Sequence, residues 1–170
     1  MSQISDVATV RLLVADYAVT DATGKLTVVG GLVTVLAANP TLQGVTAPFW
    51  LAVWVSVPAQ YHGATCQVEM VLEDAIGEPV AFGPSGQGSL VRIVQDVTFP
   101  KPELPGVYKD RDLGASLPAR TQSVIAFSLG LPLPPEKHYT WRVKVDGESR
   151  DSWTEHFLVI SQPAMQASDI

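Results

Sequence analysis

Clustered carboxylates are the residues of this 170-residue chain whose types and spacing best fit a chemical task. They form two groups in loop-like sequence: Asp110 with Asp112, and Asp146 with Glu148 and Asp151. Hard cations such as calcium bind clustered carboxylate oxygens on loops, so calcium binding is one interpretation. Arg111 and Arg150 stand within or beside these groups and can neutralise them. We therefore favour solvated acidic loops and keep calcium as the alternative.

The sequence gives less support to a nucleophilic catalytic site or a zinc site than to calcium binding. The histidines His62, His138 and His156 lie far apart in the sequence, and no residue pattern links any of them to a nucleophile and an orienting acid. No Cys/His set has zinc spacing, and "GPSGQGS" lacks both the Lys-Ser/Thr pair of a phosphate-binding loop and the spacing of a nucleophile elbow. We expect no enzyme, no cofactor and no metal site.

The single cysteine, Cys66, has no partner for an internal disulfide. It alternates with Val68 and Met70 along one predicted strand, which indicates a small buried apolar side chain.

The composition of the chain limits which classes of partner it can bind. The formal net charge of −6 and the pI near 4.9 oppose sequence-independent binding to phosphate backbones, so we do not expect nucleic acid as a partner. No stretch approaches the about 18 apolar residues that span a bilayer, and the N-terminus lacks the pattern of a signal peptide. We expect a soluble protein without membrane contact, in a reducing compartment such as the cytoplasm or on a particle assembled there.

Period-two patterning with turn signals between the runs predicts an all-β fold. The predicted strands are residues 9–18, 25–37, 49–57, 65–72, 89–99, 123–131, 139–145 and 153–160. We expect an antiparallel β-sandwich of about eight strands, with one domain over residues 1–162 and a tail over 163–170. Gly30 and Gly31 interrupt the second strand, where a bulge or sharp bend is expected.

The predicted strand "PFWLAVWVSV" at residues 48–57 is apolar on both faces. One face carries Phe49 and the residues that alternate with it, and this face fills the core. The other face carries Trp50, Ala52 and Trp54, which form a flat apolar surface if nothing covers it. We expect protein to cover it, either this chain's own loops or another copy.

A second interface candidate is the irregular segment of residues 99–117, whose prolines oppose a central strand. Long loops of this kind are often functional. The predicted interface residues are Trp50, Trp54, Pro102, Leu104, Pro105, Val107 and Tyr108.

Three stretches, "RLLVADYAVTDATGKLTVVGG", "PFWLAVWVSVP" and "YTWRVKVDGESRDSWTEHFLV", resemble a family of small uncharacterised proteins of actinobacteria and their bacteriophages. The resemblance implies an immunoglobulin-like sandwich with no known activity, although the cysteine pair of true immunoglobulin domains is missing. We expect a non-enzymatic structural or interaction protein, such as a capsid decoration or tail component of a phage particle, that contacts copies of itself or another virion protein. The alternative is a cytoplasmic regulatory module that binds a ligand or calcium.

Overall fold

The computed structural model of the chain describes residues 3–39, 44–82, 88–103, 106–108 and 112–161. Helices are short: α1 (Gln3–Val7) and the 3-10 turns η2 (Ala59–Tyr61), η3 (Gly106–Tyr108) and η4 (Asp112–Ser116). The strands are β1 (Thr9–Thr20), β2 (Leu26–Gly31), β3 (Val35–Asn39), β4 (Val45–Thr46), β5 (Phe49–Val57), β6 (Thr65–Glu73), β7 (Ala81–Phe82), β8 (Ser89–Leu90), β9 (Arg92–Thr98), β10 (Ala119–Phe127), β11 (Lys137–Val145) and β12 (Thr154–Ser161). The expected tail, residues 163–170, lies outside the described residues.

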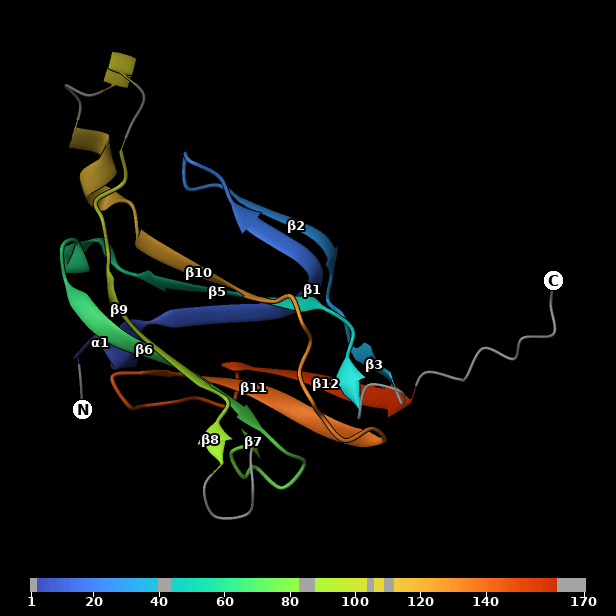
Figure 1. Ribbon diagram of the computed structural model, residues 1–170. Helices are drawn as coiled ribbons and strands as arrows, with labels where there is room; N and C mark the ends of the chain where they lie inside the picture. The colour runs from blue at the N-terminus through green and yellow to red at the C-terminus, as the bar shows by residue number, and fades with distance from the viewer. Residues whose placement is uncertain (1–2, 40–43, 83–87, 104–105, 109–111, 162–170) are drawn as a thin grey trace.

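Two large sheets face each other (Figure 1). The first has the strand order β10-β5-β1-β2, and the second has the order β4-β3-β12-β11-β6-β9; β7 and β8 form a small third sheet. The predicted all-β sandwich is confirmed, but the described residues form twelve strands instead of about eight.

The larger strand count has a local cause. The predicted strand 25–37 divides into β2 and β3, because Gly30 (φ 58°) and Leu32 (φ 62°) both adopt left-handed backbone conformations. The expected bend at the glycine pair is therefore present. The predicted strand 89–99 divides at Val91 into β8 and β9, and the short strands β4 and β7 carry too few residues to show a pattern.

The sandwich is mixed and not wholly antiparallel, because β3 pairs with β12 in parallel. The chain changes sheets just before β3. The amide of Val33 donates to the Val14 carbonyl of the first sheet, and the Thr34 carbonyl accepts from the Leu158 amide of the second. This crossover directs β3 along β12 in the same sense.

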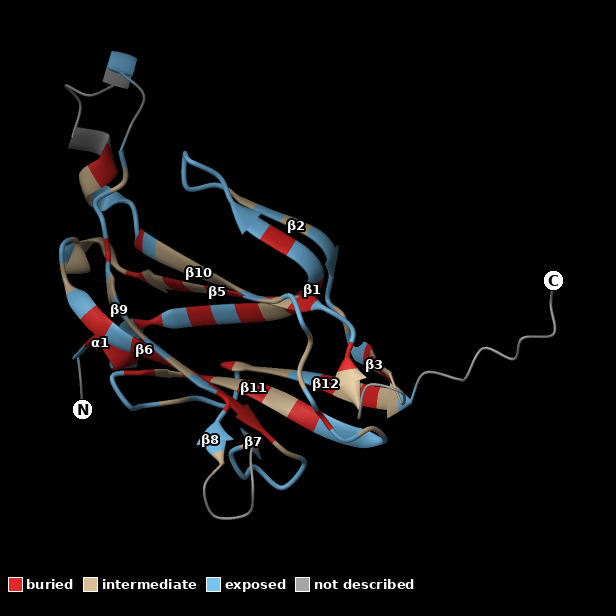
Figure 2. Cartoon of the chain, viewed as in Figure 1, coloured by how far each residue is buried: buried red, intermediate tan, exposed pale blue. Residues whose placement is uncertain are grey.

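The core lies between the sheets and has the composition that alternation predicts. The inner face of β5 is buried throughout, from Phe49 to Val57. On the opposite side, Trp141 of β11 and Trp153, just before β12, are buried. Phe127 of β10 packs against both Phe49 and Trp141. Cys66 is also buried. Figure 2 shows this alternation of buried and exposed positions along the strands.

Candidate protein interface

The outer face of β5 is covered in part by the same chain. Ala52 is fully buried, although it points away from the core, while Trp50 and Trp54 are half-buried. The first half of β1 pairs with β5 and the second half pairs with β2. The β1–β2 hairpin rises from the end of the first sheet and folds back above β5 and β10 (Figure 1).

Two sets of contacts hold the hairpin against this face. The Tyr17 ring meets the Trp50 indole with centroids 5.3 Å apart and planes at 61°. The Gln122 side-chain amide on β10 donates to the Gly24 carbonyl at 2.7 Å and to the Thr20 hydroxyl at 3.3 Å. The expectation of a protein cover is thus met by the chain's own hairpin, and the remaining exposure of the indoles is partial.

The hairpin ends in a turn that Asp21 organises. Its Oδ1 accepts hydrogen bonds from the Thr23 amide, the Thr23 hydroxyl and the Lys25 amide, at 2.7–2.9 Å. The hydrogen bond from the Thr23 hydroxyl is the main cause of the lowered pKa of the Asp21 carboxyl. Asp74 forms the same turn before Glu78, accepting from the Ile76 and Glu78 amides, so "DATGK" and "DAIGE" are equivalent structures.

The Pro-rich segment leaves the sandwich beside this hairpin and contains η3 and η4 (Figure 1). Among the predicted interface residues in it, Pro102 is half-buried and Val107 is exposed, and Tyr108 lies in η3. Leu104 and Pro105 lie outside the described residues. The base of the segment is held by His62, whose Nε2 lies 2.9 Å from the Leu117 carbonyl.

A groove runs between the hairpin and the base of the Pro-rich segment. It consists of two hollows of about 640 and 450 Å³, which share Gly24, Pro100 and Arg120. Trp54 lines the first hollow and Pro102 lines the second, so the structure brings these two predicted residues into one groove. Within the described residues Arg120 has no ion-pair partner, and it remains available to an anion.

Sequence reasoning missed the exposed face of the hairpin. Tyr17 and Val29 are direct cross-strand partners on that face, and they are 44% and 57% exposed. Val19 of β1 is exposed on the same face. Beyond the hairpin, Leu32, which follows β2, is 71% exposed, and Val35 of β3 is also exposed. The signal was present in the run "LTVVGGLVTVLAAN" at residues 26–39, which contains no charged residue and no proline.

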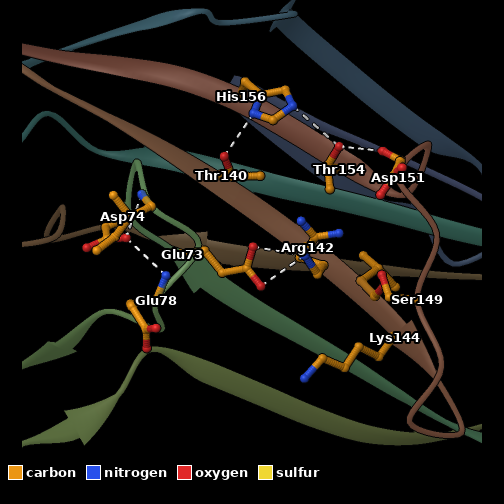
Figure 3. Close-up of polar contacts among 12 residues, drawn as sticks. Glu73, Asp74, Glu78, Thr140, Arg142, Lys144, Ser149, Asp151, Thr154 and His156 are labelled. Carbon is orange, nitrogen blue, oxygen red and sulfur yellow. Dashed lines mark hydrogen bonds and ion pairs between the residues drawn. The ribbon is translucent and has the colours of Figure 1, made fainter.

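The outer face of the second sheet is, in contrast, polar and internally paired. Arg142 donates to both carboxylate oxygens of Glu73 at 2.8 and 2.9 Å, and His156 lies between the hydroxyls of Thr140 and Thr154 (Figure 3). Beside them, Arg92 binds Glu69 at 2.8 Å, and this hydrogen bond is the main cause of the lowered pKa of Glu69. These groups satisfy one another on a solvated face.

The predicted reactive groups are dispersed or occupied. Asp146 Oδ1 accepts from the Gln67 amide at 2.9 Å, and Asp146 and Gly147 both adopt left-handed backbone conformations in this turn. In the part of the chain that the structure describes, no group of three or more His, Cys, Asp or Glu side chains is placed to hold a metal ion. Asp110 lies outside that part. Burial raises the pKa of the Cys66 thiol to about 11.

Comparisons with known proteins found no relative, so a function can be assigned only from the fold and from this surface. No family model, no curated protein and no solved structure matches the chain. Among the described residues, none of the helices has the length and apolar character needed to cross a membrane. The structure thus defines an all-β sandwich with an aromatic outer face and a hairpin folded over it.

Proposed function

We propose that this protein is a non-enzymatic interaction module that acts by protein contact, and that the exposed face of the β1–β2 hairpin is its contact surface. The observation that carries the proposal is the apolar row on that face, where Tyr17, Val19 and Val29 are each exposed by more than a third. Contiguous exposed apolar surface is uncommon on soluble monomeric domains, and where it occurs it usually marks an interaction site.

The position of the row supports a rigid docking surface. The Asp21 turn fixes one end of the hairpin, and the Tyr17–Trp50 contact fixes the other against the sandwich. A preorganised aromatic anchor loses little conformational freedom on binding. Only the family resemblance suggests that the protein belongs to a phage particle. The function proposed from the structure is the interaction role.

Site-specific photo-crosslinking in cells that produce the protein tests this role. A photo-reactive amino acid replaces Val29 in one variant and Val94 in the control, because Val94 is an exposed valine (43%) on β9, an edge strand of the other sheet. We expect a protein adduct from position 29 and none from position 94. The absence of an adduct at position 29, or equal adducts at both positions, would contradict the proposal.

The groove favours one alternative, a module that binds a small anionic ligand. Its larger hollow, about 640 Å³, is within the size of small-molecule sites, and Arg120 offers an unpaired guanidinium beside Trp54. Native mass spectrometry separates the two functions. A monomer that carries a small ligand, lost in Arg120→Ala, supports the alternative; ligand-free protein argues against it.

A further inference from the structure

The groove between the hairpin and the base of the Pro-rich segment has a free cation where its two hollows join. Arg120 lines both hollows, is exposed, and has no ion-pair partner within the described residues. Trp54 and Leu26 line the first hollow, and Leu117 and Pro102 line the second. The groove therefore fits an extended segment in which apolar groups flank one acid.

The charges around this groove favour an acidic occupant, although the chain as a whole has a net charge of −6. Lys25 in the hairpin turn is exposed, while the Asp21 carboxylate of that turn already accepts three hydrogen bonds within it. In the Pro-rich segment, Lys101 and Glu103 have opposite charges. Arg120 is thus left to an acid from elsewhere, and the acidic chain itself is a source of such a group.

The sequence that follows β12 has the composition that this groove fits. Residues 162–170, "QPAMQASDI", lie outside the described residues. Asp169 is their only charged residue, and Met165 and Ile170 are their large apolar residues. A carboxylate and a guanidinium form short charge-assisted hydrogen bonds, often two in parallel.

The position of β12 indicates that the groove of a second copy is the one within reach. Ser161 pairs with Ala38, whose other partner is Thr46, just before β5. Arg120 pairs with Ser56, near the other end of β5. The length of β5 sets these ends roughly 25 Å apart, whereas residues 162–170 span about 30 Å when fully extended. β12 also ends on the side of the sandwich opposite the Pro-rich segment (Figure 1). Within one chain, these residues would be used up in reaching the groove.

We infer that residues 162–170 of a second copy occupy the groove, with the Asp169 carboxylate on the Arg120 guanidinium and its apolar neighbours in the two hollows. The anion that Arg120 binds is then carried by the protein itself. The contact joins two different surfaces, so it builds a ring, an open chain or a reciprocal pair of copies. It is separate from the hairpin face proposed above and does not depend on it.

Charge reversal and its rescue test this contact on the full chain. Sedimentation equilibrium is measured for the wild type, Arg120→Asp, Asp169→Arg and the double variant. Lys137→Asp and Asp151→Arg make the same charge changes at exposed residues and serve as controls. We expect the wild type and the controls to self-associate. Each single reversal should weaken the association at least about tenfold, and the double variant should recover to within about threefold.

A peptide gives a second measurement on the same protein. An acetylated peptide of residues 161–170, added in excess, should dissociate the wild-type assembly by filling the groove. The same peptide with Asp169→Arg should leave the assembly intact.

A wild type that stays monomeric at every concentration overturns this inference, whether or not its native mass spectrum shows a small ligand. An assembly that the reversals or the peptide leave unchanged also overturns it, as does a double variant that is not restored. None of these results decides the crosslinking test at position 29, so the interaction role of the hairpin face is judged separately. A circular dichroism spectrum equal to that of the wild type shows that each variant is folded.

Discussion

Tyr17 and Trp50 meet edge to face, with ring centroids 5.3 Å apart, at the point where the β1–β2 hairpin turns back over the first sheet. The two rings come from strands that run side by side, so the contact joins the bend of β1 to the aromatic face of β5. This contact positions the exposed row of the hairpin.

Loss of the indole should loosen the hairpin. We expect Trp50→Ala to lower the free energy of unfolding by about 2 kcal/mol, because it removes a half-buried ring and its aromatic partner. Urea denaturation measures the change. Leu129→Ala, at a side chain that is 87% exposed, is the control and should be nearly neutral. Equal effects of the two substitutions would show that the hairpin does not depend on Trp50.

Gly130 is required where the 128–133 segment covers β4. Its φ is +69°, and a Cβ there would fall 1.9 Å from the Thr46 carbonyl oxygen, a backbone atom that cannot rotate away. Gly77 has a similar φ of +84° but open space around it. We expect Gly77→Ala to cost about 1 kcal/mol from backbone strain and Gly130→Ala to cost clearly more. Thermal and urea unfolding of both variants measure this difference, and equal costs would contradict the close approach.

The Cys66 thiol should be inert in the folded protein. It is buried, and burial raises its pKa to about 11, so the thiolate that reacts with disulfide reagents is scarce at neutral pH. We expect labelling by an aromatic disulfide reagent at pH 8 to be far slower than in denaturant. Labelling of the folded chain at the rate of the denatured chain would contradict this burial.

Glu69 should contribute to acid sensitivity. Its hydrogen bond from Arg92 lowers its pKa below the ordinary value of 4.5, so the folded state favours the ionised carboxylate. The stabilisation is complete above the unfolded-state pKa and is lost as the pH falls through the lower folded-state value. We expect Glu69→Gln to lose less than about 1 kcal/mol at neutral pH, because Arg92 is partly exposed, and to show a flatter decline in acid.

Unfolding measured from neutral to acidic pH tests this prediction. Glu78→Gln, at an exposed carboxylate, should leave the decline as steep as in the wild type. A steeper decline in Glu69→Gln than in the wild type would reverse the sign and contradict the account.

Alternation of side chains was enough to predict most strands and the buried face of β5, because apolar positions two apart must share a face. The bend at Gly30 was likewise visible, since only glycine adopts such conformations readily. The parallel pairing of β3 with β12 was not visible. It depends on a crossover between sheets, and no local pattern records which distant strand a segment joins.

The candidate interface was predicted in part. Trp50 and Trp54 lie on the outer face, as alternation requires, but their cover is a hairpin whose path depends on contacts with Gln122, about a hundred residues away. Val29 and Leu32 were missed because an exposed apolar residue in a strand has the same pattern as a buried one. The missing charges along residues 26–39 were the available signal.

Photo-crosslinking from position 29, on the exposed face of the β1–β2 hairpin, tests the central claim most directly. We predict a protein adduct at this position and none at position 94 on the edge strand β9. The absence of an adduct at position 29, or equal adducts at both positions, would contradict the assignment of this face as the contact surface.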